Sequence, residues 1–308
     1  MTTVLLLGAT GFLGRHILAR LDRHLTVRAP TRRECDLVAT DVAALAALLR
    51  REQPDVVVNA AGRIVGSAAD HLRAHALATA TLIEAMTLAV PSSRLIRIGS
   101  AAEYGRVPHG IAVGEEHPAV PVSEYGTSHL AATRLAVLAA STGRLDTMVL
   151  RVFNPIGSGM PVENMLGRVS ALLRTATQRG ERSVSLGLHD TYRDFVDARD
   201  VADAVWAAIS VRRPQAHVFN VGSGRAVPVR AAVRLLADAA GFTGTVTDGS
   251  FPPDAARSAA VPWMCADIGR SARLLGWSPR HSLAEAVAAL WTEQAPVPRA
   301  GQVGVGSR

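Results

Sequence analysis

The segment between residues 4 and 21 constrains the fold more than any other part of the sequence. The aliphatic run Val4–Leu7 leads into Gly8–Gly14, which reads GATGFLG, and apolar residues then recur with helical spacing up to Leu21. A strand that enters a helix through three glycines is typical of the first unit of a parallel α/β sheet, because Gly8 permits a tight turn and Gly14 lets the helix lie against the strand. We therefore predict such a sheet.

The rest of the first half repeats this alternation of short apolar runs and helical patterns. The further predicted strands are 25–29, 55–59, 95–99 and 147–152, and the helices between them are 42–49, with Thr40 or Asp41 as the cap, about 69–89 and 124–141. This order predicts a doubly wound parallel sheet. After Asn154, a Pro- and Gly-rich loop precedes a helix at about 163–179, strands near 184–187 and 217–221, a helix starting at Asp200, and two or three helices in 226–292.

The composition excludes several classes of protein. The net charge is +7, but all 33 basic residues are arginines that occur at most in pairs, without interleaved aromatics, so we expect no nucleic-acid partner. No apolar stretch is long enough to span a bilayer and no signal peptide is recognisable, so we expect no membrane partner. Cys35 and Cys265 are too far apart in sequence for a redox or metal pair, which predicts no metal and a reducing, cytoplasmic compartment.

The glycine segment also predicts a dinucleotide ligand. Backbone amides and the helix dipole face an anion at the start of a helix, and Gly11 lets the backbone approach a pyrophosphate. The free ribose hydroxyl of NAD needs a carboxylate about twenty residues further on, but the chain has Arg32 and Arg33 there. Arginines suit a 2′-phosphate, so we expect NADP(H), with NAD(H) as the alternative. The cofactor contacts predicted from these segments are Gly8, Thr10, Gly11, Phe12, Leu13, Gly14, Arg32, Arg33, Asp36, Leu37, Asn59, Ala60 and Ala61.

Further motifs follow in order along residues 3–292. They are NAA at 59–61, GSAAEYG at 99–105, YGTSH at 125–129, RVFNP at 151–155, RDFVD at 193–197, NVG at 220–222 and LGWSP at 275–279. With them, the chain resembles the extended short-chain dehydrogenase/reductase family, and within it the nucleotide-sugar 4-ketoreductases and epimerases.

The resemblance implies a Rossmann fold with a smaller C-terminal substrate-binding lobe. We expect a dinucleotide-binding domain of 1–155 plus about 190–225, and a lobe of about 156–189 and 226–292. The aperiodic end of the chain, 293–308, is rich in Gly and Pro and is expected to be a disordered tail.

The same resemblance assigns the chemistry to Ser100, Tyr125 and His129. Ser100 would hydrogen-bond the substrate carbonyl, and Tyr125 would give or take a proton while hydride moves to or from the nicotinamide. A phenol with a pKa of about 10 must be acidified for this at neutral pH, and the family uses a lysine one helical turn after the tyrosine. This chain has His129 there, and His75 replaces an asparagine common in the family. Tyr125, His129 and Val152 would also contact the cofactor.

His129 leaves several possibilities open. With an ordinary pKa of about 6.5 it would be partly charged near neutral pH. It could then hydrogen-bond the nicotinamide ribose and lend Tyr125 positive charge in acid, act only through a water, or have no role. If it carries the role, hydride transfer should fall as His129 deprotonates between about pH 5.5 and 8.

Other positions narrow the reaction. Related dehydratases carry an Asp-Glu pair after the serine, but here the pair is Ala101 and Ala102, and methyl groups cannot do acid/base work. The ending Glu103-Tyr104-Gly105 is similar to 4-keto-6-deoxysugar reductases. The residues expected at the substrate by resemblance are Ser100, Ala101, Asn154, Asn164, Arg193 and Arg257, of which Arg193 could instead pair with Asp194 or Asp197.

Four hypotheses follow. The leading one is an NAD(P)H-dependent ketoreductase acting on a nucleotide-activated 4-keto-6-deoxyhexose. The alternatives are a nucleotide-sugar 4-epimerase with tightly bound NAD, a ketoreductase of a non-sugar natural-product scaffold, and a catalytically weak dinucleotide-binding protein. The Ala-rich helices 69–89 and 124–141 are expected to form a homodimer interface, as they commonly do in the family.

Overall fold

The centre of the molecule is a six-stranded parallel sheet with the strand order β10-β5-β4-β3-β1-β2. The structure is a computed structural model that describes residues 2–187, 190–249 and 261–292. The strands of the sheet are β1 Thr3–Leu7, β2 Thr26–Arg28, β3 Val56–Asn59, β4 Arg94–Ser100, β5 Thr147–Val152 and β10 Val218–Val221. The predicted doubly wound parallel sheet is confirmed.

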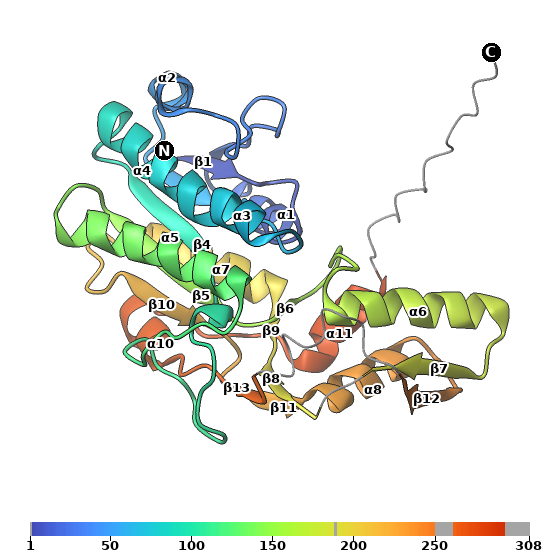
Figure 1. Ribbon diagram of the computed structural model, residues 1–308. Helices are drawn as coiled ribbons and strands as arrows, with labels where there is room; N and C mark the ends of the chain where they lie inside the picture. The colour runs from blue at the N-terminus through green and yellow to red at the C-terminus, as the bar shows by residue number, and fades with distance from the viewer. Residues whose placement is uncertain (1, 188–189, 250–260, 293–308) are drawn as a thin grey trace, which may run out of the picture.

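Helices cover both faces of the sheet (Figure 1). On one face lie α1 (Phe12–Leu21) and α7 (Ala198–Ser210), and on the other lie α2 (Val42–Glu52), α4 (Ala78–Ala89) and α5 (Glu124–Ser141). Alternate residues of β1 enter the two cores, because Val4 and Leu6 pack against α1 while Leu5 and Leu7 pack against α2 and α4. Burial on both faces explains why the central strands read as continuous apolar runs.

The helix predicted over 69–89 is one helical run in three parts. It consists of α3 (Ala68–Leu72), the π-helical turn η1 (Arg73–Leu77) and α4. The π-helical turn holds His75, and such turns are frequent at functional sites. A short 3₁₀ turn, η2 (Ala101–Glu103), follows β4.

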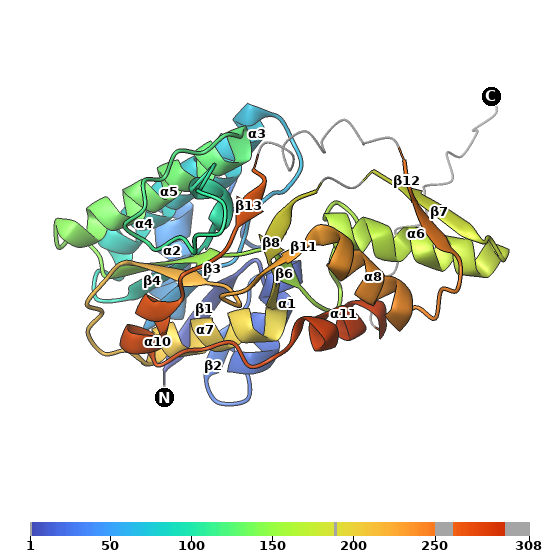
Figure 2. The same ribbon diagram turned by 90° about the horizontal axis from the view of Figure 1, so that it is seen from below.

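A second core lies to one side of the sheet in both views (Figures 1 and 2). It is built from α6 (Met165–Arg179), α8 (Val229–Ala239), α11 (Leu283–Thr292) and the parallel pair of β7 (Ser183–Leu186) and β12 (Thr245–Asp248). Between this group and the sheet, β6 (Pro155–Ile156) pairs with β9 (Val196–Asp197). A small sheet of β11 (Ala226–Pro228), β8 (Tyr192–Asp194) and β13 (Trp263–Met264) lies nearby, and α10 (Gly269–Leu275) follows it.

Several local predictions can be compared with this structure. Asp41 caps α2 by accepting a hydrogen bond of 2.8 Å from the Ala44 amide, as one of the two expected caps. The helix expected to begin at Asp200 begins at Ala198 and is capped by Asp197. The expected tail 293–308 lies outside the described residues. None of the described helices is both long enough and apolar enough to cross a bilayer.

Candidate active site

The turn after β1 needs its glycines for two different reasons. Gly8 has a φ of +82°, and a Cβ there would lie 2.6 Å from the Ala61 amide nitrogen, so the turns after β1 and β3 touch. A Cβ on Gly14 would lie 1.9 Å from the Gly8 carbonyl oxygen, so α1 rests on the turn itself. Gly11 is exposed, and its nearest neighbour would be 3.2 Å away. The outer surface of the turn is therefore open.

This open surface fits the pyrophosphate of a dinucleotide. Gly11 is the N-cap of α1 and provides no side-chain cap, and the first turn of the helix has no acidic residue. The amides at the start of α1 therefore face outward with the positive end of the helix dipole. A side chain at Gly8 or Gly14 would displace backbone that forms the cradle. Of the other residues predicted here, Thr10 is exposed, and Phe12 and Leu13 are half-buried.

The segment after β2 contains both of the predicted arginines. The Arg32 side chain is 78% exposed and its Nε donates 2.9 Å to Asp36. Glu34 accepts hydrogen bonds from the amide and hydroxyl of Thr31, so this turn also contains a carboxylate. Because an exposed ion pair contributes little free energy, Arg32 can leave Asp36 for a stronger anion. Arg33 is exposed, and Leu37 is buried.

Tyr125 and Ser100 are brought together by a close approach between α5 and η2. A Cβ on Gly126 would lie 2.4 Å from the Ala102 carbonyl oxygen, so the glycine after Tyr125 lets the helix contact the turn after β4. The Ser100 hydroxyl interacts with the Tyr125 phenol and also accepts a hydrogen bond of 3.2 Å from the Ala102 amide. The two hydroxyl groups expected to act on the substrate are thus adjacent.

A buried ion pair fixes the backbone of Ser100. Glu103 is fully buried and accepts hydrogen bonds from the Ser100 amide, at 3.1 Å, and from Arg151 Nε, at 2.8 Å. The Arg151 guanidinium also lies 4.6 Å from the ring centroid of Tyr104. In the sequence, Glu103 and Tyr104 served only to indicate the family. In the structure, Glu103 binds the Ser100 amide and Arg151, and Tyr104 packs against Arg151.

Three histidines surround the Tyr125 ring. The ring centroids of His71, His75 and His129 lie 5.6, 5.4 and 4.6 Å from that of Tyr125. His75 Nε2 must accept a hydrogen bond from the Arg63 amide, at 3.1 Å, so its proton is on Nδ1, which donates 2.8 Å to Ser128 Oγ. His75 is therefore neutral, and burial together with the nearby charge of Arg97 lowers its pKa to about 3.

The same contacts connect the histidines to the glycine turn. Ala61 touches the Gly8 position, and a Cβ on Gly62 would lie 3.4 Å from His75 Nε2. The ring of His75 in turn lies 4.0 Å from that of His129, centroid to centroid. The cradle and the hydroxyl pair therefore belong to one continuous site along the carboxyl ends of β1, β3 and β4.

His129 is neutral, which corrects the expectation that it is partly charged near pH 7. Its Nδ1 lies 3.1 Å from a terminal nitrogen of Arg97, and a guanidinium can only donate, so the His129 proton is on Nε2. Burial, and then the charge of Arg97, lowers the pKa of His129 well below 6.5. His129 therefore does not lose a proton between pH 5.5 and 8, and we no longer expect the activity to fall in this range because of His129.

Arg97 is a site residue that sequence reasoning missed. It lies on β4, is 3% exposed, and donates hydrogen bonds of 3.3 Å to Thr79 and to Thr133 as well as the one to His129. A signal was present in the sequence. An arginine in the middle of the otherwise apolar run Leu95–Gly99 is unusual in a strand buried on both faces.

Two of the other expected substrate residues, Arg193 and Asn154, lie at β8. Arg193 is 9% exposed and donates 2.7 Å to the Tyr192 carbonyl, and burial lowers its pKa to about 10. Asn154 has a φ of +28° and its amide donates 2.8 Å to the Asp194 carbonyl. Asn164 is the N-cap of α6 without a side-chain cap bond. Arg257 lies outside the described residues.

The two carboxylates suggested as alternative partners of Arg193 have other contacts. Asp194 accepts hydrogen bonds from Ser223, Gly224 and Ala266, and Asp197 forms a two-pronged pair with Arg199. Asp194 and Asp197 are thus held by groups other than Arg193. In the part of the chain that the structure describes, no group of three metal-ligating side chains comes together.

A doubly wound sheet with a glycine cradle after its first strand and a serine–tyrosine pair beside it defines a Rossmann-fold protein of the short-chain dehydrogenase/reductase class. The model of the NAD dependent epimerase/dehydratase family matches residues 4–222, and the chain belongs to this family.

Known relatives include reductases and epimerases. The chain is 38% identical to a dTDP-6-deoxy-L-talose 4-dehydrogenase (NAD(P)(+)) of Kitasatospora kifunensis, over 96% of each chain. It is 28% identical to a UDP-glucose 4-epimerase of Azospirillum brasilense, over 98% of this chain and 94% of the relative. Its fold matches the structure of RMD from Pseudomonas aeruginosa complexed with NADPH with a TM-score of 0.83 and 25% identity, over 94% of this chain and 98% of the other.

Proposed function

We propose that this chain is an NAD(P)H-dependent ketoreductase that acts on the keto carbon of a nucleotide-activated 4-keto-6-deoxy sugar. The observation that carries the proposal is the close approach at Gly126, which places Tyr125 next to Ser100 beside a glycine cradle. Ala101 and Ala102, which follow Ser100, offer no acid or base for the removal of water. Reduction of a carbonyl needs only a proton donor, a hydrogen-bond donor and a source of hydride.

The roles of the residues follow from their contacts. When bound in the cradle, the nicotinamide dinucleotide would supply the hydride. Ser100 would donate a hydrogen bond to the carbonyl oxygen, and the O–H bond of Tyr125 would break as a new O–H bond forms on that oxygen. Burial raises the pKa of Tyr125, so the phenol holds its proton at neutral pH, and the interaction with Ser100 and the charge of Arg97 act in the opposite direction and favour release of that proton. A proton from the solution then restores the Tyr125 phenol, so that each turnover consumes one hydride and one proton.

The substrate proposed first is a thymidine-diphosphate sugar. The relative from Kitasatospora kifunensis is named for the 4-position of a dTDP-6-deoxy sugar, and it matches nearly the whole chain. Arg193, a buried residue on the central strand of the small sheet of β11, β8 and β13, would bind the diphosphate, because a guanidinium matches phosphate oxygens with two hydrogen bonds. Asn154, Asn164 and Arg257 remain candidates for contacts with the sugar and the diphosphate.

The direct test is the loss of NADPH absorbance when purified protein meets dTDP-4-keto-6-deoxyhexoses, with UDP- and GDP-linked sugars as the comparison. We expect stoichiometric formation of the 4-hydroxy sugar. An epimerase would instead purify with bound NAD, interconvert two 4-hydroxy sugars and consume no NADPH. Binding of NADPH without turnover of any keto sugar would contradict the proposal and leave a non-sugar ketone or a binding role.

The preference for NADP(H) over NAD(H) is part of this proposal. Arg32 and Arg33 support it because both lie after β2 and are exposed, so that they can meet a 2′-phosphate. Arg32 must first leave Asp36, which makes Arg33 the better single probe. The ratio of kcat/KM for NADPH and NADH should fall in Arg33→Ala and change little in Arg28→Ala, whose charge faces Glu52 at 3.6 Å.

We also propose a homodimer formed through α4 and α5. Leu88 on α4 and Leu138 on α5 are 61% and 59% exposed, and Leu135 on α5 is 37% exposed, whereas Leu82 on α4 enters the core. Pairing of these helices with a second copy would remove both side chains from water. The mass of the purified protein in solution, measured by light scattering, tests this. The cytoplasmic location expected from the sequence belongs to the same proposal, since Cys35 and Cys265 are free thiols.

A further inference from the structure

Arg97 differs from the other buried arginines of the same sheet in how its charge is balanced. Arg94 on β4 lies 2.8 Å from Asp146, and Arg151 on β5 lies 2.8 Å from Glu103. Among the described residues, Arg97 forms no ion pair with a carboxylate, and its guanidinium donates only to two threonine hydroxyls and one imidazole. The charge of Glu103, which is paired with Arg151, acts on Arg97 only from beyond ion-pair distance. A buried cation without an anionic partner is costly, so its retention calls for an anion that forms nearby.

Tyr125 is where such an anion forms if the proposed reduction takes place. Loss of the phenol proton to the substrate leaves a phenolate inside a site whose burial disfavours charge. The charge of Arg97 opposes this effect, and so does the contact with Ser100. The groups around Tyr125 that carry or can carry charge are Arg97 on β4, Glu103 on η2, His71 on α3, His75 on η1 and His129 on α5.

Within this group, His75 and His129 do not provide the positive charge. His75 and His129 are held neutral by the amide and the guanidinium that donate to them. Glu103 is negative and is paired with Arg151. Arg97 is an arginine and keeps its charge, and His129 contacts both Arg97 and the Tyr125 ring.

We propose that Arg97 is a positioning residue of the reaction, which holds His129 as the neutral Nε2–H tautomer and supplies, behind that ring, the fixed positive charge that stabilises the Tyr125 phenolate. The inference rests on the proposed function. The acidifying charge is thus divided between two side chains. His129 contributes a donor at Nε2, which has no partner among the described residues, and Arg97 contributes a charge that does not titrate near neutral pH.

This arrangement makes a specific prediction for the ligand-free protein. The chain has three tyrosines, so ring-labelled tyrosine can be followed by NMR through a pH titration, and Tyr125→Phe identifies the signal. In Arg97→Gln, which keeps an N–H donor for His129 and removes the charge, the pKa of Tyr125 should rise by about one unit or more. Arg97→Lys, which keeps the charge, should leave it closer to the wild-type value.

Arg94→Gln is the matched control. Arg94 is also buried and lies on the same strand, three positions before Arg97 and at the opposite end of β4 from Ser100. It is paired with Asp146 and with backbone carbonyl groups. The substitution should lower the stability without moving the Tyr125 titration. The double variant Arg97→Gln/His129→Lys moves the charge to position 129 and should restore the titration toward the wild-type value. Equal titrations in Arg97→Gln and Arg94→Gln overturn the proposal.

A second measurement needs no variant that might fail to fold. Imidazole nitrogen shifts of labelled wild-type protein report the tautomer, and we expect His129 at neutral pH to carry its proton on Nε2. A proton on Nδ1, or an imidazolium, contradicts the proposal. Both measurements use protein without cofactor, so they remain decisive even if no keto sugar is reduced. In that case the proposed function is wrong, and the two measurements still test the coupling of Arg97 to Tyr125 independently.

Discussion

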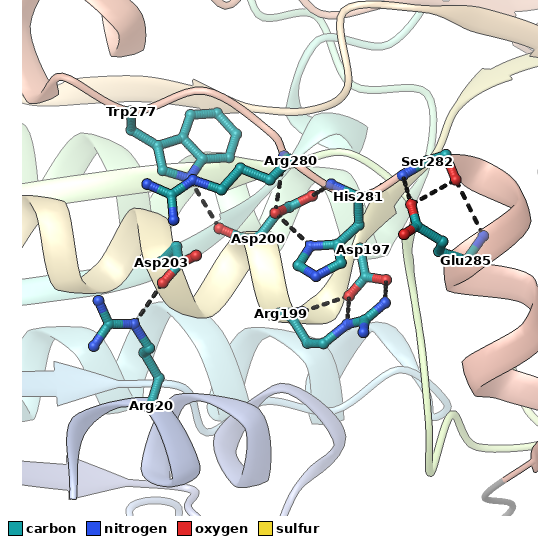
Figure 3. A network of polar contacts seen from close by, with 10 residues as sticks. All are labelled: Arg20, Asp197, Arg199, Asp200, Asp203, Trp277, Arg280, His281, Ser282 and Glu285. Atoms are coloured by element: carbon teal, nitrogen blue, oxygen red, sulfur yellow. Dashed lines mark hydrogen bonds and ion pairs between the residues drawn. The ribbon is translucent and has the colours of Figure 1, made fainter. Parts of the chain in front are cut away.

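Two polar networks in this molecule are built from similar residues but are completed in opposite ways. Around Asp200 on α7, the carboxylate accepts hydrogen bonds of 3.0, 3.0 and 2.8 Å from the amides of Arg280 and His281 and from His281 Nδ1 (Figure 3). The Asp200 carbonyl accepts another from Trp277 Nε1. Each donor meets an acceptor, and the segment before α11 is thereby tied to the sheet.

The network around Tyr125 is left incomplete. His71 is fully buried, yet neither of its ring nitrogens has a hydrogen-bond partner among the described residues. Among the same described residues, Arg97 forms no ion pair with a carboxylate, and His129 Nε2 has no hydrogen-bond acceptor. A closed network indicates a structural role, whereas buried groups with unused capacity indicate a place where a ligand or a transient charge completes the set. This difference predicts opposite responses to mutation.

The largest expected effect is on turnover at the incomplete network. Tyr125→Phe removes one oxygen from a packed ring, so the protein should fold and bind NADPH while kcat for the keto sugar falls by about 10²- to 10⁴-fold. Steady-state kinetics and a thermal melt, compared with wild type, separate the two properties. Near-normal turnover in this variant would mean that another group donates the proton and that the open capacity around Tyr125 has a different purpose.

The closed network should respond in stability. Asp200→Ala leaves two backbone amides and one imidazole without an acceptor in a buried position, and we expect the free energy of unfolding to fall by about 3 kcal/mol or more. Asp200→Asn, which keeps one acceptor oxygen, should cost less. Urea denaturation gives both values. If kcat at a permissive temperature fell in step with that of Tyr125→Phe, the distinction between the two networks would be wrong.

The histidines of the open network should make the stability depend on pH. The pKa of His75 is about 3 in the folded protein, and its ordinary value is 6.5. Between these values the unfolded chain binds the proton and the folded chain does not, so the free energy of unfolding falls as the pH falls below about 6.5. The slope is about 1.4 kcal/mol per pH unit for each such histidine, and His129 has the same direction of shift.

Denaturation in urea at several pH values between about 5 and 7 measures this slope. His75→Asn retains an amide that can replace both hydrogen bonds and cannot be protonated, so it should remove about one histidine's share of the slope. His281→Asn in the closed network serves as the control and should leave the slope due to His75 intact. An unchanged slope in His75→Asn would mean that His75 is protonated in the folded state.

A structural feature could be predicted from the sequence where the residues that determine it are close together in the chain. The strands β1 and β3–β5 were predicted because burial on both faces makes each a largely apolar run, and Asp41 was one of two expected caps because a cap lies beside its own helix. The unpredicted strands β8 and β13 have two or three residues each and pair across the chain, Tyr192 with Trp263. Such short segments show no periodicity of their own.

The site divides in the same way. Ser100 and Tyr125 could be identified from motifs, and the structure brings them together through the close approach at Gly126. The charge state of His129 could not be predicted, because it is set by burial and by Arg97, which is 32 residues away in sequence. The ordinary pKa of a histidine was the best available guide, and it predicted a partial charge on His129 that burial and the neighbouring Arg97 disfavour.

The smallest effect is expected at the edge of the closed network. Arg20 on α1 donates 2.5 Å to Asp203 on α7, but the two side chains are 29% and 22% exposed, and the guanidinium also lies over the ring of Trp206, 4.3 Å from its centroid. Water can take over the hydrogen bonds of both groups, so Asp203→Asn should cost less than about 1 kcal/mol in urea denaturation, and less still in high salt. The stacking on Trp206 should survive, since it needs only Arg20. If Asp203→Asn lowered the free energy of unfolding as much as Asp200→Ala, the exposed pair would stabilise the protein as strongly as the buried carboxylate. The contribution of a contact in this network would then not depend on its exposure to solvent.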